Sequence, residues 1–166
     1  MNGYAAEKSN LKRLLIGSRM AEISYGEFFR LLFEREPTAF YALLIDAPCW
    51  FGDREAWVTR ARASDSRKAA EEGEDCLLAC ELTRLRYNNL IRVEDVEFLD
   101  DCMAITFEGE NVLSVAYYHE SDFAWILEEV SSRAEQERVS ICCQGNELFQ
   151  NNIEGLESGF CNQLGE

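Results

Sequence analysis

The single histidine, His119, is the first place where this sequence could carry chemistry. It stands in Tyr117-Tyr118-His119-Glu120, at the expected end of a strand. Any Ser/His/Asp or Cys/His arrangement would have to use this imidazole, but no serine or cysteine lies in a nucleophile-elbow pattern. We therefore expect His119 to be solvated or structural, or to form a polar and aromatic contact patch with Tyr118 and Glu120.

The densest group of carboxylates is the run Glu94, Asp95, Glu97, Asp100 and Asp101. In a strand, Asp95 and Glu97 share one face and Glu94 takes the other, whereas Asp100 and Asp101 fall in the following turn. Carboxylates can act as acid and base, bind a divalent cation or attract a basic partner. A solvated strand edge is the plainest alternative, because charges there discourage pairing between edges.

Several familiar motifs are absent from the sequence. It has no pair of histidines at metal-binding spacing, no Gly-rich phosphate loop, no dinucleotide fingerprint and no EF-hand loop. These absences argue against hydrolase, kinase, NTPase, redox and zinc chemistry. The remaining enzymatic alternative is a site made of carboxylates alone, and we expect no enzyme and no cofactor.

The cysteines predict free thiols rather than disulfides. Their number is odd, no Cys-x-x-Cys pair occurs, and the polar start of the chain has no secretory signal. The longest apolar run, near 40–45, is too short for a membrane helix. We expect a cytoplasmic protein in which all seven thiols are reduced and unligated: Cys49, Cys76, Cys80, Cys102, Cys142, Cys143 and Cys161.

Tryptophans supply the main aromatic bulk. Trp57 and Trp125 each precede an aliphatic residue and are expected to anchor the core. Trp50 and Phe51 follow Pro48 in an expected loop. Either that loop folds back over the core, or it offers exposed aromatic side chains to a partner.

Hydrophobic periodicity predicts two helices and a series of short strands. Asp75 is the expected N-cap of the second helix. Met103, Ile105 and Phe107 alternate with smaller or more polar residues, as a strand with one buried face should. Hairpin turns are expected at 108–111 and at Gly145-Asn146. The helices are expected at 10–16 and 76–86, and the strands at 20–24, 28–34, 40–47, 56–62, 90–98, 102–108, 112–118, 124–130, 139–143 and 147–150.

Three short sequence similarities recur in the same order and predict an internal duplication. They pair Leu11–Leu14 with Leu82–Leu85, Phe28–Glu34 with Cys102–Glu108, and Ala56–Val58 with Ala124–Ile126. The alternative is that β proteins reuse similar amphipathic strings. We predict one α+β domain, residues 1–166, with mostly antiparallel strands in two similar units and short helices along one side. The halves are residues 11–62 and 82–130, joined through 63–75 and followed by a hairpin at 139–150 and a tail at 151–166.

Charge is distributed unevenly along the chain. The net charge is −15; residues 1–70 hold 11 basic and 9 acidic side chains, whereas residues 71–166 hold 5 and 22. Such a field repels nucleic acid and anionic membranes and attracts basic partners. Solubility alone is the other explanation of this acidity.

A hydrophobic–x–Phe strand, a following hairpin and an Ala-Trp-aliphatic strand, set in a small acidic chain of repeated strand units, give the sequence a family resemblance. It resembles immunity proteins of bacterial polymorphic toxin systems and related uncharacterised families. The similarity covers residues 11–130 and carries no family binding residue over to this chain. It implies a non-enzymatic inhibitor that plugs a toxin, often through an acidic surface.

The leading hypothesis is therefore an acidic binding protein that occludes a basic protein partner. One alternative is a small-molecule or metal-dependent carboxylate site in a cleft between the halves, which a deep pocket with converging carboxylates would favour. Another is a structural or homo-oligomeric role through an exposed strand edge. The expected contact residues are acidic (Glu94, Asp95, Glu97, Asp100, Asp101, Glu120 and Asp122) and aromatic or polar (Trp50, Phe51, Tyr118 and His119).

Overall fold

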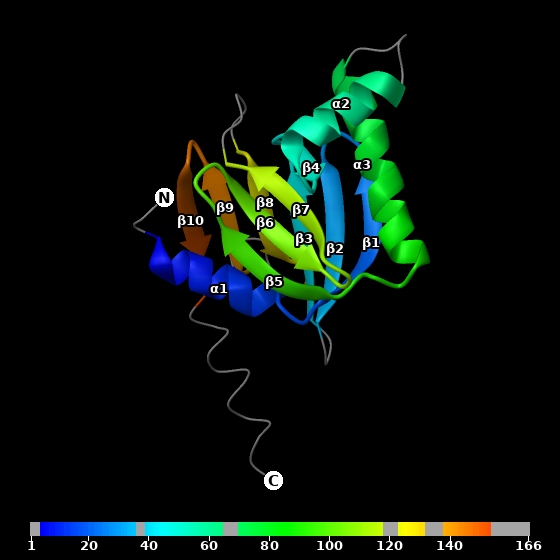
Figure 1. The fold of residues 1–166 in the computed structure, drawn as a ribbon. Coiled ribbons are helices and arrows are strands. Elements are labelled where there is room, and N and C mark those ends of the chain that lie inside the picture. Colours follow the sequence, from blue (N-terminus) through cyan, green and yellow to red (C-terminus); the bar gives the residue numbers. More distant parts are fainter. Residues whose placement is uncertain (1–3, 36–38, 65–69, 118–122, 132–137, 154–166) are drawn as a thin grey trace.

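The computed structural model describes residues 4–35, 39–64, 70–117, 123–131 and 138–153. Within these ranges the chain forms three helices and ten strands (Figure 1). In chain order they are α1 (Ala5–Leu15), β1 (Arg19–Tyr25), β2 (Phe29–Arg35), β3 (Ala39–Ile45), β4 (Cys49–Phe51), α2 (Arg54–Ser64), α3 (Ala70–Tyr87), β5 (Val93–Phe98), β6 (Cys102–Phe107), β7 (Asn111–Ala116), β8 (Trp125–Glu129), β9 (Ser140–Gln144) and β10 (Glu147–Asn151).

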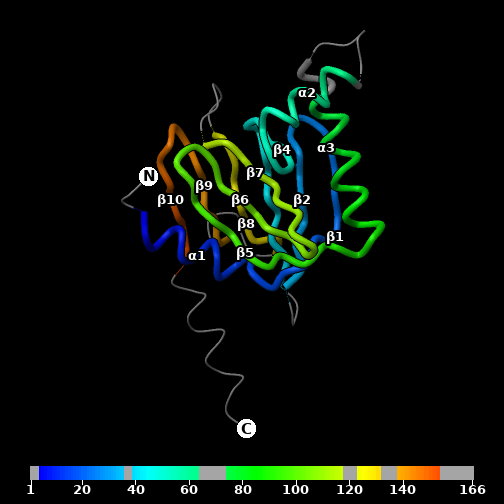
Figure 2. Tube along the Cα trace, in the orientation of Figure 1, coloured from blue at the N-terminus to red at the C-terminus, as the bar shows by residue number. Residues whose placement is uncertain are grey.

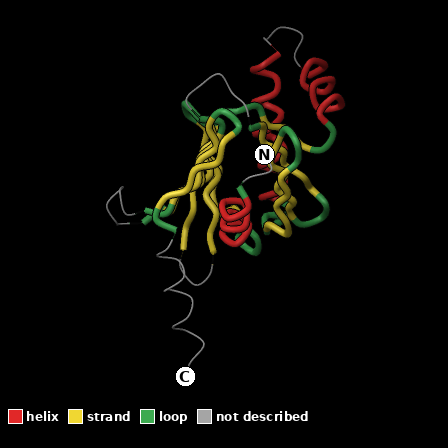
Figure 3. The backbone as a smooth tube through the Cα atoms, turned by 90° about the vertical axis from the view of Figure 1, so that its left-hand side faces the viewer, coloured by secondary structure: helices red, strands yellow, loops and turns green. Residues whose placement is uncertain are grey.

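The strands form two antiparallel sheets. The larger has the order β1-β2-β3-β8-β9-β10, and the smaller has the order β4-β7-β6-β5. Figure 3 shows the sheets as two layers with α1 inserted between them at one end. Contacts of α1 with β5 on one side and with β2 and β10 on the other agree with this view. Helices α2 and α3 pack on each other beside β4.

The path of the chain recurs. Strands β1, β2 and β3 form an antiparallel meander, and so do β5, β6 and β7. After each meander the next strand crosses to the other sheet: β4 pairs with β7, and β8 pairs with β3 (Figure 2). Each sheet therefore contains one strand that follows the meander of the other sheet. These two strands connect the layers.

The two meanders meet where their first strands begin. Arg19 and Arg92 form an isolated antiparallel bridge. On one side of it the Met20 N–H donates to the Ile91 carbonyl at 2.9 Å, and on the other the Val93 N–H donates to the Ser18 carbonyl at 2.9 Å. A register shift follows in each strand, after Met20 in β1 and after Val93 in β5. Such bulges increase local twist and bend the strand.

A single hydrophobic cluster spans both sheets. Met103, Ile105 and Phe107 of β6 are fully buried, as their predicted alternation requires. The ring of Phe107 stacks against Phe33 of β2, with 6.4 Å between ring centroids. The facing side chains of the two layers thus form one core.

The predicted α+β class with mostly antiparallel strands is confirmed. Hairpin turns lie at the predicted places: residues 108–110 join β6 to β7, and residues 145 and 146 join β9 to β10. Gly109, Glu110, Gly145 and Asn146 have positive φ, between 55° and 72°. In the last hairpin, both central residues of a two-residue loop take this conformation, which is typical of a type I′ turn.

Other predictions are wrong. The strand expected at 56–62 is helix α2, because the Asp53 carboxylate caps it by accepting the Ala56 N–H at 2.8 Å. The expected loop at Trp50 and Phe51 is strand β4, which pairs with β7. Asp75 lies inside α3 rather than at its N-cap, because the helix already begins at Ala70.

The predicted duplication of residues 11–62 and 82–130 is not confirmed. Its tryptophan landmark fails, since Trp57 lies on helix α2 whereas Trp125 lies on strand β8. The path of the strands does recur. The tryptophan on the crossing strand β4 is Trp50, however, and not Trp57.

Candidate functional site

The predicted acidic run lies along one edge of the four-stranded sheet. Strand β5 is an edge strand and carries Glu94, Asp95 and Glu97, and the turn to β6 carries Asp100 and Asp101. We call these five residues the acidic edge. All are exposed except the half-buried Asp95, whose Oδ1 accepts the Val96 N–H at 2.8 Å. No ion pair joins the acidic edge to any residue within the described ranges.

The register of the sheet brings part of the acidic edge onto the same face as Trp50. Glu97 pairs with Ala104, Ala104 with Ser114, and Ser114 with Trp50. Since residues that pair across a sheet share a face, this row lies on the face of the sheet opposite to the one that carries Phe51, Leu113 and Ile105. The middle of the row consists of the small side chains of Ala104 and Ser114. Acidic residues therefore lie at one edge of this face and Trp50 lies at the other.

Trp50 carries a cation. The guanidinium of Arg54, the first residue of α2, lies over the indole with 4.7 Å from its central carbon to the ring centroid. This is the separation of a cation–π contact. Most of the Trp50 side chain is also kept from solvent. Trp50 is therefore not the exposed aromatic side chain that one of the two predictions for its loop required.

Phe51 is buried as well. Its side chain points into the core, where its ring lies 6.2 Å from that of Trp57. Because neighbours in a strand face opposite sides, Trp50 and Phe51 cannot serve one surface. The other four predicted contact residues, Tyr118, His119, Glu120 and Asp122, lie outside the described residues.

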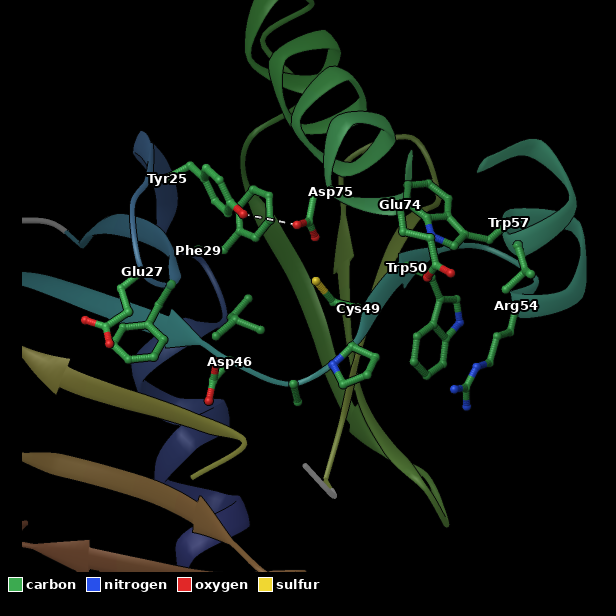
Figure 4. A pocket seen from close by; sticks show the side chains of 15 residues that line it. Tyr25, Glu27, Phe29, Asp46, Cys49, Trp50, Arg54, Trp57, Glu74 and Asp75 are labelled. Atoms are coloured by element: carbon green, nitrogen blue, oxygen red, sulfur yellow. Dashed lines mark hydrogen bonds between the residues drawn. The ribbon is translucent and has the colours of Figure 1, made fainter. Parts of the chain in front are cut away.

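A pocket of about 400 Å³ lies where the chain crosses from β3 to β4 (Figure 4). We call it the crossing pocket. Its walls come from the β1–β2 turn, the end of β3, strand β4 and helices α2 and α3. Four carboxylates line it: Glu27, Asp46, Glu74 and Asp75.

Aromatic side chains complete the walls of the crossing pocket. The Tyr25 hydroxyl donates to Asp75 Oδ2 at 3.1 Å, and the Tyr25 ring lies 4.5 Å from that of Phe29. Trp57 also lines the pocket, yet its indole N–H is buried and has no hydrogen-bond partner among the described residues.

Cys49 lies between these groups but is poorly suited to nucleophilic chemistry. Burial, followed by the negative charges of Asp75 and Glu74, raises the pKa of its thiol to about 12. A thiolate is the reactive form of cysteine, so this thiol is inert near neutral pH. Burial and the neighbouring Asp101 likewise raise the pKa of Cys102, to about 11. The six cysteines within the described ranges are all free thiols.

Within the described part of the chain, no three His, Cys, Asp or Glu side chains lie close enough together to hold a metal ion. No helix there is both long and apolar enough to cross a membrane. The carboxylates of the crossing pocket are thus arranged around a cavity rather than around a single point.

Only weak sequence signals point to the crossing pocket. Glu27 and Asp46 follow two strands of one predicted meander, so their position at the same end of the sheet could have been inferred. Glu74 and Asp75 enter from α3, about 50 residues from Tyr25. Only the tertiary packing of α3 beside β4 brings them there.

Comparisons with known proteins add no relative: no family model, curated protein or solved structure matches the chain.

Proposed function

We propose that the protein is a non-enzymatic, acidic binding protein whose partner is a basic protein. The observation that carries the proposal is the acidic edge, where five carboxylates share one sheet edge and its turn without an ion pair to any described residue. An internal role in stability would leave these charges paired. Four of the five carboxylates are exposed, so their charges act on what approaches from solvent.

The acidic edge belongs to the more acidic part of the chain. Residues 71–166 hold 22 acidic side chains against five arginines, and one of these arginines, Arg84, forms an ion pair with Glu81. Complementary charge raises the rate of association and suppresses wrong partners. A toxin bound in the manner of an immunity protein is the class of partner that the sequence resemblance suggests.

The proposal is tested by reversing charge at the acidic edge. We expect the triple variant E94K/E97K/D101K to slow association at low salt by about tenfold or more and to flatten its salt dependence, because long-range attraction acts on the encounter rate. The probe is any basic protein encoded beside this gene, and the rates are measured by stopped-flow fluorescence at two salt concentrations.

A matched control separates position from total charge. The variant E34K/E55K/E147K makes the same change at exposed sites on β2, α2 and β10, and it should keep most of the wild-type rate. Equal rates for the two variants would show that the acidity serves solubility and not recognition. Failure of every neighbouring basic protein to bind would remove the toxin from the proposal.

A further inference from the structure

We propose that the crossing pocket is a separate binding site for an alkyl cation, an ammonium or guanidinium group carried on an aliphatic chain with an oxygen acceptor nearby. The pocket shares no carboxylate with the acidic edge. The inference therefore stands or fails independently of the basic protein partner.

The charge of the lining favours a cation. Four carboxylates face one guanidinium, that of Arg54, which already lies over Trp50. Glu27 and Glu74 form no hydrogen bond or ion pair with any other residue that the structure describes. The four carboxylates come from the β1–β2 turn, the segment that follows β3, and α3, so several elements bring them to the pocket (Figure 4). Carboxylates along a single solvated strand edge would not lie on several elements around one cavity.

The aromatic walls favour an organic cation over a metal ion. The paired rings of Tyr25 and Phe29 give the pocket an apolar wall on which a cation on a carbon chain can lie. The hydroxyl of Tyr25 fixes Asp75 against these rings. A volume of about 400 Å³ falls within the usual range of small-ligand sites.

Trp57 provides an independent sign of a missing ligand atom. It is 1% exposed, and its N–H finds no acceptor among the residues that the structure describes, as is also true of the Trp125 N–H and the Tyr117 hydroxyl. Buried polar groups in native proteins nearly always have a hydrogen-bond partner. A carbonyl or carboxylate oxygen close to the cation would accept this hydrogen, and lysine and arginine derivatives carry both groups.

The thiol of Cys49 reports the same electrostatic field. After burial, the charges of Asp75 and Glu74 are what raise its pKa. A potential that disfavours a thiolate stabilises a bound cation in the same place.

The probes are cadaverine, Nα-acetyl-lysine-N-methylamide and, as an uncharged control, 1,5-pentanediol. We expect both cations to shift the Trp57 indole N–H resonance in a saturable way, and pentanediol not to do so. Binding of cadaverine alone would assign the site to free amines, and tighter binding of the lysine derivative to a polypeptide side chain. No saturable shift by either cation at 10 mM, or equal shifts by pentanediol, would overturn the proposal.

Two variants test the mechanism by calorimetry. E74Q/D75N removes two charges without changing shape and should weaken both cations by about tenfold or more, whereas E110Q/E147Q, on exposed sites elsewhere, should leave them unchanged. Unchanged binding by E74Q/D75N would contradict the proposed role of these carboxylates.

W57F keeps an aromatic wall and removes the N–H that has no partner, so folding should be preserved. It should weaken the lysine derivative more than cadaverine, which lacks the acceptor. Equal weakening of both ligands would remove the acceptor from the proposal.

Discussion

The two crossing strands follow the same path but have different neighbours. Strand β8 enters the middle of the six-stranded sheet, between β3 and β9, and its Trp125 is fully buried. Strand β4 stops at the edge of the four-stranded sheet after three residues and is followed by α2 and α3. The same kind of crossing thus places one strand in the middle of a sheet and the other in the wall of a pocket. Which of the two results depends on whether strands or helices come next along the chain.

The largest expected effect separates the two tryptophans of the crossing strands. Trp125→Ala should lower the free energy of unfolding by about 3–5 kcal/mol, because it leaves a large cavity in the middle of a sheet. Trp50→Ala should cost about 2 kcal/mol, since that ring lies on the outer face beneath the solvated Arg54. Urea denaturation measures both values. Equal losses would show that the central or edge position of the strand does not set the cost.

A smaller effect concerns the contact between the helices that follow β4. Glu81 of α3 accepts hydrogen bonds from Arg60 of α2 at 2.6 Å and from Arg84 at 2.7 Å. Burial would raise the pKa of Glu81, but the two arginines outweigh it and lower the pKa. At pH 7 we expect Glu81→Gln to lower the free energy of unfolding by about 1.5 kcal/mol, because it removes the charge that both arginines contact. The loss is no larger because both arginines are half exposed and solvent screens their charges.

The pH dependence of that cost has a definite sign. A carboxyl group with a lowered folded-state pKa stabilises the protein above its ordinary pKa of about 4.3, and this contribution is lost as the pH falls through the folded-state value. Wild type and Glu81→Gln should therefore converge in thermal melts as the pH drops below about 4. A constant difference down to pH 2 would assign the cost to packing rather than to charge.

The smallest expected effect lies at the junction of β4 and α2. Asp53→Ala removes the cap of α2 and should cost about 1 kcal/mol, whereas Asp53→Ser, which still accepts a hydrogen bond, should cost only a few tenths. Thermal melts of the two variants provide the measurement. If alanine is tolerated as well as serine, packing against α3 rather than the cap holds the helix in place.

Local patterns predicted what depends on neighbours in sequence. Alternation in β6 and the turn residues Gly145 and Asn146 specify a strand and a hairpin by themselves. Helix α2 also carried a local signal, because Asp53 precedes Trp57 and Ala61, which are buried at a spacing of one helical turn. The strand interpretation of that segment relied on a tryptophan match and overlooked this spacing.

Partners far apart in sequence explain the remaining errors. Trp50 forms a strand because it pairs with Ser114 of β7, and no pattern within three residues of chain can encode that pairing. The acidic edge was found because five carboxylates are nearly consecutive. The crossing pocket was missed because Glu27, Asp46 and Glu74 come from separate elements, and only the fold places them around one cavity.

The exchange of β4 and β8 also determines when the protein can fold during its synthesis. Strand β3 reaches its partner β8 only after about 80 further residues have been made, and at roughly 5–20 residues per second this takes about 4–16 s. Until then the apolar edge of β3 is open to pairing with other nascent chains. On the ribosome, the four-stranded sheet has all its strands once β7 has been made, whereas the six-stranded sheet still lacks β8, β9 and β10, so the larger layer closes last.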